Sequence, residues 1–218
     1  MIFAQKIVIL RAKFENSETM KLVFASNNAH KLDEVRKILA DVEVLSLREV
    51  GFLHEIDETG ETLEENSRLK AETVWQWLSD HALDTKVDGV FADDTGLEIE
   101  ALNGAPCVYS ARWAGEPSND ANNRAKALYE LANEENRDAR FRTVITLIGH
   151  QVNMQVEGVV QGKMALEEHG TGGFGYDALF IPEGYADTFA TLSAEEKNSI
   201  SHRARALEAL NKMLLKGK

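Results

Sequence analysis

The pattern of hydrophobic residues near the start of the chain predicts a strand that is followed directly by a helix. Residues 22–25 form a short apolar run, and apolar residues then recur at Leu32, Val35, Ile38 and Leu39. A short apolar run between polar residues is typical of a buried strand, whereas spacings of three and four residues are typical of an amphipathic helix.

Similar patterns predict further elements in the next part of the chain. A strand is expected at residues 43–47, and Thr62 with Glu65 forms a capping-box pattern that predicts the start of a long helix. The expected buried face of this helix consists of Leu63, Leu69, Val74, Trp77 and Leu78. The elements expected next are a strand from Gly89, a sharp turn at Thr95 and Gly96, and a second strand with Leu97, Ile99 and Ala101 on one side.

The second half of the chain alternates in the same way. We expect a loop at residues 103–117 and then a helix at 118–133 with Ala121, Ala125, Leu128 and Leu131 inward. Residues 141–148 and 152–161 predict a hairpin, because apolar and polar residues alternate in its second strand. Ser193 and Glu196 form another capping box, and a terminal helix is expected from about His202, with Ala206, Leu207, Leu210 and Leu214 on one side. The order of elements predicts an α/β fold with a mixed sheet, as one domain or two lobes sharing a core.

Composition and charge exclude several classes of protein. The net charge is −12, which argues against binding a nucleic acid polymer through a broad electrostatic surface. No apolar run approaches the roughly 20 residues of a membrane span. Cys107 is the one cysteine, so the chain cannot form an internal disulfide, and a reducing compartment, the cytoplasm, is expected. We interpret Cys107 as a packed thiol, and residues 1–19 as an extension, either a misassigned start or an extra strand, before a domain that begins at Met20.

The polar turn between the first strand and helix is the first candidate site. Amide groups at a helix start attract anions, and a lysine one turn in adds a full charge. These features favour a phosphate site, although an ordinary helix cap with a solvated lysine is the alternative. The candidate residues are Ser26, Asn27, Asn28, Ala29, His30 and Lys31.

Two adjacent acidic residues, Asp93 and Asp94, follow an apolar strand and form the second candidate site. Neighbouring carboxylates repel each other, so such a pair is usually solvated or bound to a metal, and Mg²⁺ prefers carboxylates, water and phosphates. A turn that uses Asp and Gly for conformational reasons is the alternative. Glu58, in the loop before the long helix, is a further carboxylate, whereas periodicity leaves open whether Lys70 points inward or outward.

Two segments near the end of the chain complete the candidates. Four glycines within residues 170–175 permit close backbone approach, and Phe174, Gly175, Tyr176 and Asp177 combine aromatic rings with a carboxylate, which suits a planar heterocycle. A glycine-rich loop whose aromatic residues fill the core is the alternative. Lys197, His202 and Arg203 gather near a helix start, where a cation is unfavourable unless an anion is bound.

The ordered motifs SNNAHK, ETG, EN, KA, ADDTGL, GAPCVYSARWAGE, GTGGFGYD and EKNSISHR resemble the inosine triphosphate pyrophosphatase family, the noncanonical purine nucleoside triphosphate pyrophosphatases. The resemblance runs from Met20 to about Leu214. It implies an elongated, two-lobed α/β domain on a long mixed sheet with a central cleft. It also implies hydrolysis of ITP, dITP and XTP to the monophosphate and pyrophosphate, as part of cleansing the nucleotide pool, and a homodimer.

The resemblance also assigns roles to residues. Asp94 matches the proton acceptor for water, and Glu58 and Asp94 match positions associated with Mg²⁺, with Mn²⁺ as the alternative metal. Residues 26–31 and Lys70 match phosphate contacts, and Thr95 matches a substrate contact. We expect Asp93 to support the site residues without contacting the substrate itself. Residues 174–177, Lys197, His202 and Arg203 match substrate-binding positions.

Three alternative functions differ in their chemistry. A Maf-type pyrophosphatase would act on pyrimidine or modified nucleotides. A nucleotide-binding regulator would bind without turnover, although clustered carboxylates offer little to a mere anion binder. A metal-dependent nuclease is disfavoured by the acidic balance of the chain.

Overall fold

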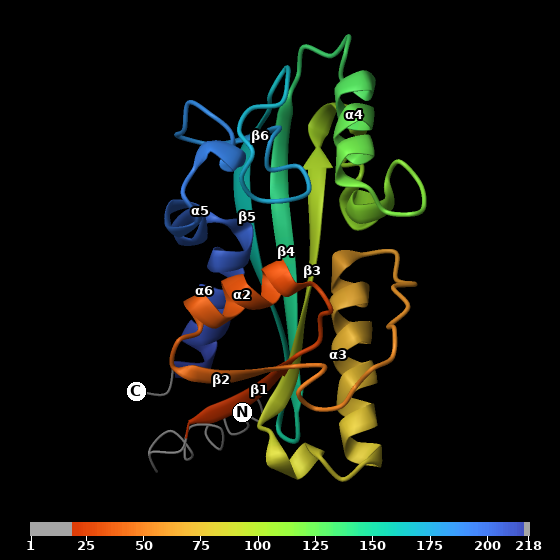
Figure 1. Ribbon diagram of the computed structural model, residues 1–218, viewed down its shortest axis with the longest axis vertical. Helices are drawn as coiled ribbons and strands as arrows, with labels where there is room; N and C mark the ends of the chain where they lie inside the picture. The colour runs from red at the N-terminus through yellow and green to blue at the C-terminus, as the bar shows by residue number, and fades with distance from the viewer. Residues whose placement is uncertain (1–18, 216–218) are drawn as a thin grey trace, which may run out of the picture. The chain divides into compact units, whose positions relative to one another are not determined.

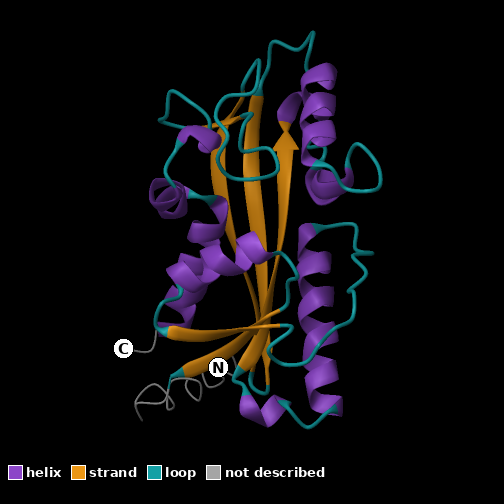
Figure 2. Cartoon of the chain, in the orientation of Figure 1, coloured by secondary structure: helices purple, strands orange, loops and turns teal. Residues whose placement is uncertain are grey.

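The computed structural model describes residues 19–215 and contains a mixed β-sheet with helices beside it (Figure 2). The six strands of the sheet have the order β2-β1-β3-β4-β5-β6. β1 is parallel to both β2 and β3, and β5 is antiparallel to β6. The predicted extension, apart from residue 19, lies outside the described residues. The strands are β1 (Met20–Phe24), β2 (Val42–Ser46), β3 (Gly89–Ile99), β4 (Asp138–Gly149), β5 (Val152–Met164) and β6 (Phe180–Pro182).

The helices begin where polar side chains satisfy their first amide groups. Asn28, Thr62, Asn119 and Ser193 each accept a hydrogen bond from the amide three residues later, so both predicted capping boxes cap a helix. The helices are α2 (Ala29–Ile38), α3 (Leu63–Asp80), α4 (Asp120–Glu130), α5 (Ala194–Ile200) and α6 (His202–Leu215).

The described chain divides into two compact units, each with its own hydrophobic core. The first contains residues 19–94, 144–157 and 206–215, and the second contains residues 95–143 and 158–205. β3, β4 and β5 therefore contribute residues to both units.

Alternation along β1 gives the first unit two cores, one on each face of the sheet. Leu22 and Phe24 pack in a cluster with residues of α2 and α6, whereas Val23 and Ala25 pack in a cluster with residues of α3. α2 and α6 thus cover one face and α3 covers the other (Figure 1). The predicted inward residues of the terminal helix, Ala206, Leu207, Leu210 and Leu214, are all buried.

The second unit is built around one cluster that joins β3, β4, β5 and α4. Phe141, Phe180 and Phe189 form its aromatic centre, with the rings of Phe141 and Phe180 4.8 Å apart. The His202 ring stacks on Phe141 at 4.6 Å, so this predicted site residue is also part of the core.

The predicted turn at Thr95 and Gly96 is wrong, because β3 continues without interruption to Ile99. A Cβ atom on Gly96 would lie 2.8 Å from the Cys107 carbonyl oxygen, so the glycine permits close backbone contact rather than a turn. Ala101 lies in a short 3₁₀ helix, Glu100–Leu102, and not in a second strand. The expected loop at 103–117 contains another 3₁₀ helix, Cys107–Arg112.

The buried faces of two helices also differ from the prediction. Ala121 and Ala125 of α4 are exposed, because Asn123 turns inward and bonds the amide of Ala114 and the carbonyl of Ala111. In α3, Leu63, Val74 and Leu78 are buried as predicted, but Leu69 and Trp77 are only partly buried. The polar residues Asn66, Ser67 and Lys70 share this buried face, which a purely hydrophobic pattern does not reveal.

Candidate functional site

The first candidate group lies in the first unit, where β3 carries Asp93 and Asp94 side by side. Both are buried, yet each has its own lysine: Lys31 Nζ of α2 lies 3.0 Å from Asp93 Oδ1, and Lys70 Nζ of α3 lies 2.8 Å from Asp94 Oδ1. Since successive strand residues point to opposite faces, the two acids meet the helices that cover those faces. Lys31 is therefore an ion-pair partner and not the solvated lysine of the alternative interpretation.

Lys70 joins two carboxylates that are distant in the sequence. Its Nζ also donates to Glu58 Oε1 at 3.1 Å, so one buried ammonium binds both Glu58 and Asp94. Lys70 itself is buried, which settles the direction that periodicity left open. Asp94 Oδ2 is buried without a hydrogen-bond partner among the described residues.

Burial and neighbouring charges together shift the pKa values of Asp94 and Lys70. Burial raises the pKa of Asp94 above its ordinary value, although Lys70 and Lys31 act to lower it. Burial disfavours the charged form of Lys70, but the carboxylates of Asp94, Glu58 and Asp93 together raise its pKa above the ordinary value. Lys70 therefore remains an ammonium at neutral pH.

The predicted anion site at the start of α2 is partly used for capping. Asn28 Oδ1 accepts from the Lys31 amide at 3.1 Å, and Ser26 Oγ accepts from the Asn28 amide at 3.2 Å. Asn27, Ala29 and His30 are exposed. The helix cap and the Lys31–Asp93 pair thus occur together, so the cap does not exclude an anion site.

A buried polar network fixes α3, and the hydrophobic pattern of the sequence does not reveal it. Ser67 Oγ and Gln155 Nε2 both bond Thr146 Oγ1, at 2.7 and 2.9 Å. Asn66 Oδ1 accepts from the Gly60 amide at 2.8 Å and so holds the loop that carries Glu58. Asparagine has a low helix propensity, so its position inside a predicted helix indicates that its side chain has a specific role.

The second candidate group lies in the second unit, around Asp177. Its Oδ2 accepts from Lys197 Nζ at 2.7 Å and from the Phe174 amide at 2.8 Å. Lys197 Nζ lies 4.8 Å from the centre of the Phe174 ring, and Arg203 Cζ lies 5.8 Å from it. Lys197 and Arg203 are both buried, so two cations flank a half-buried aromatic ring.

The remaining predicted residues of this group are fixed by other contacts. Tyr176 is buried and donates its hydroxyl to the Ser110 carbonyl at 2.9 Å, and burial raises the pKa of this phenol. Of the amides in residues 174–177, those of Phe174, Gly175 and Asp177 donate to acceptors within the unit. The backbone of this segment is therefore largely committed to holding its own shape.

Thr95 and Cys107, both in the second unit, lie outside this group. Thr95 Oγ1 lies 2.9 Å from Thr143 Oγ1, so the two hydroxyls share a hydrogen bond between β3 and β4. Cys107 is partly buried, and burial together with Glu98 raises the pKa of its thiol. A raised pKa is the opposite of what a nucleophilic cysteine requires, which agrees with a structural thiol.

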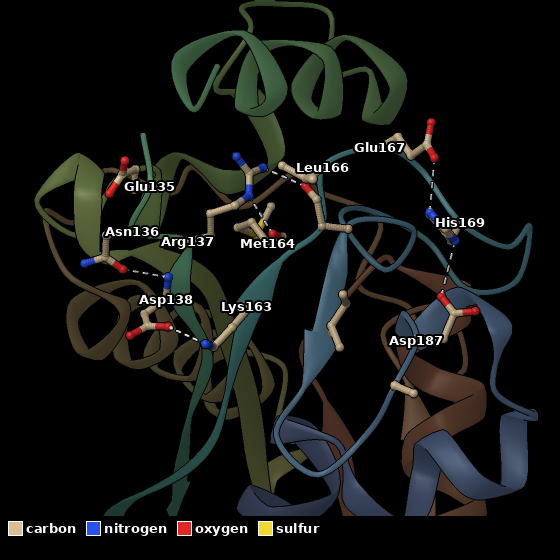
Figure 3. Close-up of a pocket in the computed structure, with 13 residues that line it drawn as sticks. Glu135, Asn136, Arg137, Asp138, Lys163, Met164, Leu166, Glu167, His169 and Asp187 are labelled. Carbon is tan, nitrogen blue, oxygen red and sulfur yellow. Dashed lines mark hydrogen bonds and ion pairs between the residues drawn. The ribbon is translucent and has the colours of Figure 1, made fainter. Parts of the chain in front are cut away.

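A surface cavity of about 880 Å³ in the second unit contains none of the predicted site residues (Figure 3). Arg137 lies in its wall and donates to the carbonyl oxygens of Met164, Leu131 and Ala165 at 2.7, 3.1 and 2.6 Å. Its guanidinium therefore ties three backbone segments together and is committed to structure.

We expect Arg137→Ala to lower the free energy of unfolding by about 2–4 kcal/mol, because three carbonyl groups each lose one donor. Turnover at saturating substrate should be unchanged. Denaturant unfolding measures the loss, and Arg140→Ala is the control, since Arg140 is exposed and its partner Glu98 would keep its ion pair with Arg142. Equal, small losses in both variants would contradict this role for Arg137.

Two features are absent from residues 19–215. None of their helices is both long enough and apolar enough to cross a membrane. They contain no cluster of three or more His, Cys, Asp or Glu side chains suited to a metal ion. Glu58 and Asp94 thus form a two-carboxylate group, to which a substrate would have to add further ligands.

The mixed sheet and its helices make this an α/β protein. Its acid–lysine pairs form a charged site on strand β3. Residues 22–213 match the model of the Ham1 family, and the chain belongs to this family. The protein is 48% identical to the dITP/XTP pyrophosphatase of Porphyromonas gingivalis, over 89% of this chain and 97% of that protein. It is 46% identical to the dITP/XTP pyrophosphatase of Flavobacterium psychrophilum, over 88% and 97%.

Solved structures agree with this assignment. The Staphylococcus aureus Ham1 protein superimposes with a TM-score of 0.80 at 39% identity, covering 91% of this chain and all of that one. A nucleoside-triphosphatase, dITP/XTP pyrophosphatase, from Mycobacterium abscessus gives 0.70 at 39% identity, covering 88% and 98%. The predicted α/β fold and the predicted family are confirmed, and the Maf-type alternative is not supported.

Proposed function

We propose that this Ham1 family protein hydrolyses dITP, ITP and XTP to the nucleoside monophosphate and pyrophosphate. The observation that carries the proposal is the Lys70 ammonium bound between Glu58 and Asp94, beside the Lys31–Asp93 pair. Lysines and carboxylates in one group suit a reaction that neutralises phosphate charge while a base acts on water.

The residues of the first unit fit a divalent cation. Asp94 Oδ2 is buried and without a hydrogen-bond partner among the described residues, and Glu58 is partly exposed beside it on Lys70. Glu58 and Asp94 would hold Mg²⁺, or Mn²⁺ as the alternative, with phosphate oxygens and water as the remaining ligands. Bound there, the ion would neutralise phosphate charge and lower the pKa of water.

Asp94 serves in this proposal as the base that orients and deprotonates the attacking water. Its Oδ2 is buried and has no hydrogen-bond partner among the described residues, so this oxygen is available to accept a hydrogen bond from water. Lys31 and Lys70 stabilise the phosphate oxygens, assisted by the donors at the start of α2. Asp93 keeps Lys31 in place through their 3.0 Å contact.

The residues of the second unit serve in base recognition. Phe174 offers a ring face, and the Lys197 ammonium and the Arg203 guanidinium near it can donate hydrogen bonds but cannot accept them. A 6-keto purine presents an acceptor to such donors, whereas the 6-amino group of adenine presents a donor. A donor opposite a donor remains unpaired when buried, which favours ITP over ATP. The amides of Phe174, Gly175 and Asp177 already donate within the unit, so we assign this contact to the Arg203 guanidinium, which carries several donor groups.

The family resemblance and the single cysteine support two further parts of the proposal. The protein acts in the cytoplasm on the free nucleotide pool, and it assembles as a homodimer. Light scattering of the full chain measures its mass directly, and a mass of one chain would refute the dimer.

Pyrophosphate release with ITP, XTP, GTP and ATP, with and without Mg²⁺, tests the function. We expect release from ITP and XTP at least about 100-fold more efficient than from ATP, and loss of activity when the metal is removed. Equal efficiency with ITP and ATP would refute the account of base recognition. Binding of ITP without pyrophosphate release would favour a regulator over an enzyme.

A further inference from the structure

Two side chains of α4 bind both polar backbone atoms of a single residue in the glycine-rich segment. Asp120 Oδ2 accepts from the Gly175 amide at 2.7 Å, and Arg124 Nη1 donates to the Gly175 carbonyl at 2.9 Å. Asp120 and Arg124 are four residues apart and so lie on one side of the helix. Gly175 is therefore held from both ends by one rigid element.

The glycine-rich segment needs such support, because it lies outside regular secondary structure. Gly170, Gly173 and Gly175 have φ values of +79°, +72° and +61°, which few other residues adopt easily, so the free chain has many competing conformations. Arg124 Nε also lies 3.0 Å from Glu168 Oε2. One guanidinium thus contacts a residue just before the glycine run and the last glycine in it.

The residues next to Gly175 form the base-recognition group. Phe174 precedes it and has both Lys197 and Arg203 near its ring, while Asp177 accepts from both the Phe174 amide and Lys197. A shift of Gly175 would move the Phe174 ring relative to these cations. These contacts of Asp120 and Arg124 are with Gly175 and Glu168, and not with the lysine–carboxylate pairs of the first unit.

We propose that Asp120 and Arg124 are positioning residues for base recognition, which set the place of Phe174 by clamping Gly175. The proposal rests on the proposed function of the second unit. The clamp affects which purine is bound, through KM, and leaves the cleavage of the phosphate chain largely unchanged.

Arg124→Ala tests the clamp against Lys126→Ala, a matched control. Lys126 lies on the same helix and its loss changes the charge equally, but its ammonium donates to the Trp113 carbonyl and lies over the Trp113 ring. We expect Arg124→Ala to raise KM for ITP about tenfold, to keep kcat within about threefold, and to lower the preference for ITP over ATP about tenfold. A merely structural role would lower kcat with the folded fraction and leave KM and preference equal to those of the control.

Replacement of Asp120 provides a test by conservative rescue. Asparagine keeps an oxygen that accepts from the Gly175 amide, whereas alanine does not. We expect Asp120→Asn to retain the KM and the preference of the wild type, and Asp120→Ala to behave like Arg124→Ala. Equal behaviour of the two Asp120 variants would overturn the proposal.

Hydrogen exchange separates failure of the clamp from failure of the proposed function. The Gly175 amide should exchange at least about tenfold faster in Asp120→Ala than in wild type, with or without nucleotide. Unchanged exchange would overturn the clamp even if the wild type discriminates between ITP and ATP. Faster exchange in a wild-type background that shows no such discrimination would instead refute the role in base recognition.

Discussion

Replacing Asp94 with asparagine should reduce kcat for pyrophosphate release from ITP by about 100-fold or more, the scale of losing a general base. Asparagine has nearly the same size and still accepts a hydrogen bond from Lys70, which lies 2.8 Å from Asp94 Oδ1. It cannot take a proton from water, and it is a weaker ligand for Mg²⁺. The chemical step should therefore suffer more than the fold.

The control for this prediction is Asp138→Asn, the same chemical change at an exposed position whose lysine contact spans 3.7 Å. Its kcat should lie within about twofold of wild type, because exposed ion pairs contribute little. Thermal unfolding of both variants shows whether folding is preserved. A folded Asp94→Asn protein with near-normal turnover would remove Asp94 from the proposed chemistry.

Replacing Lys70 with methionine should lower the free energy of unfolding by about 3 kcal/mol at neutral pH without metal, because it leaves buried Asp94 without its closest cation. Turnover should fall as well, since Lys70 is a proposed phosphate contact. Mg²⁺ should stabilise the variant more than it stabilises wild type, because the ion would replace the missing positive charge between Glu58 and Asp94. Denaturant unfolding with and without Mg²⁺ measures both effects.

The destabilisation caused by Lys70→Met should depend on pH. The pKa of Asp94 is already raised by burial, and removing Lys70 raises it further. When the pKa of a carboxyl group is higher in the folded state than in the unfolded state, the group has no effect on protein stability below the unfolded-state pKa. As the pH rises through the folded-state pKa, the group loses its proton and destabilises the folded protein. The loss should therefore be smaller in acid than at pH 8. Lys163→Met, at an exposed lysine, should show no such trend, and a loss independent of pH would contradict the role given to the Lys70–Asp94 pair.

Local chemistry explains which elements were predictable from the sequence. Thr62 and Ser193 cap their helices as expected, because a cap depends on residues within one turn. The turn at Gly96 was wrong because that glycine accommodates the backbone of Cys107, which comes 11 residues later and cannot be anticipated from neighbours. Prediction from the sequence therefore failed where a residue contacts a part of the chain that is distant in sequence.

The candidate site shows the same division. Its members were found through motifs, but their partners were not: the direction of Lys70 depends on Glu58 and Asp94, and periodicity does not encode ion pairs. Asp120 and Arg124 were missed because they bind Gly175 from more than 50 positions away. Nothing in their local sequence distinguishes them from other charged residues on a helix surface.

The pleat of β3 has a consequence for how the chain tolerates insertions. Adding or deleting one residue just before Asp93 would exchange the sides to which the two acids project, so each would confront the other's helix. Lengthening the strand by two residues would restore the sides but displace both carboxylates along the sheet. The number of residues in this part of β3 is thus as constrained as the identity of its side chains. Changes in chain length are better tolerated in the loops.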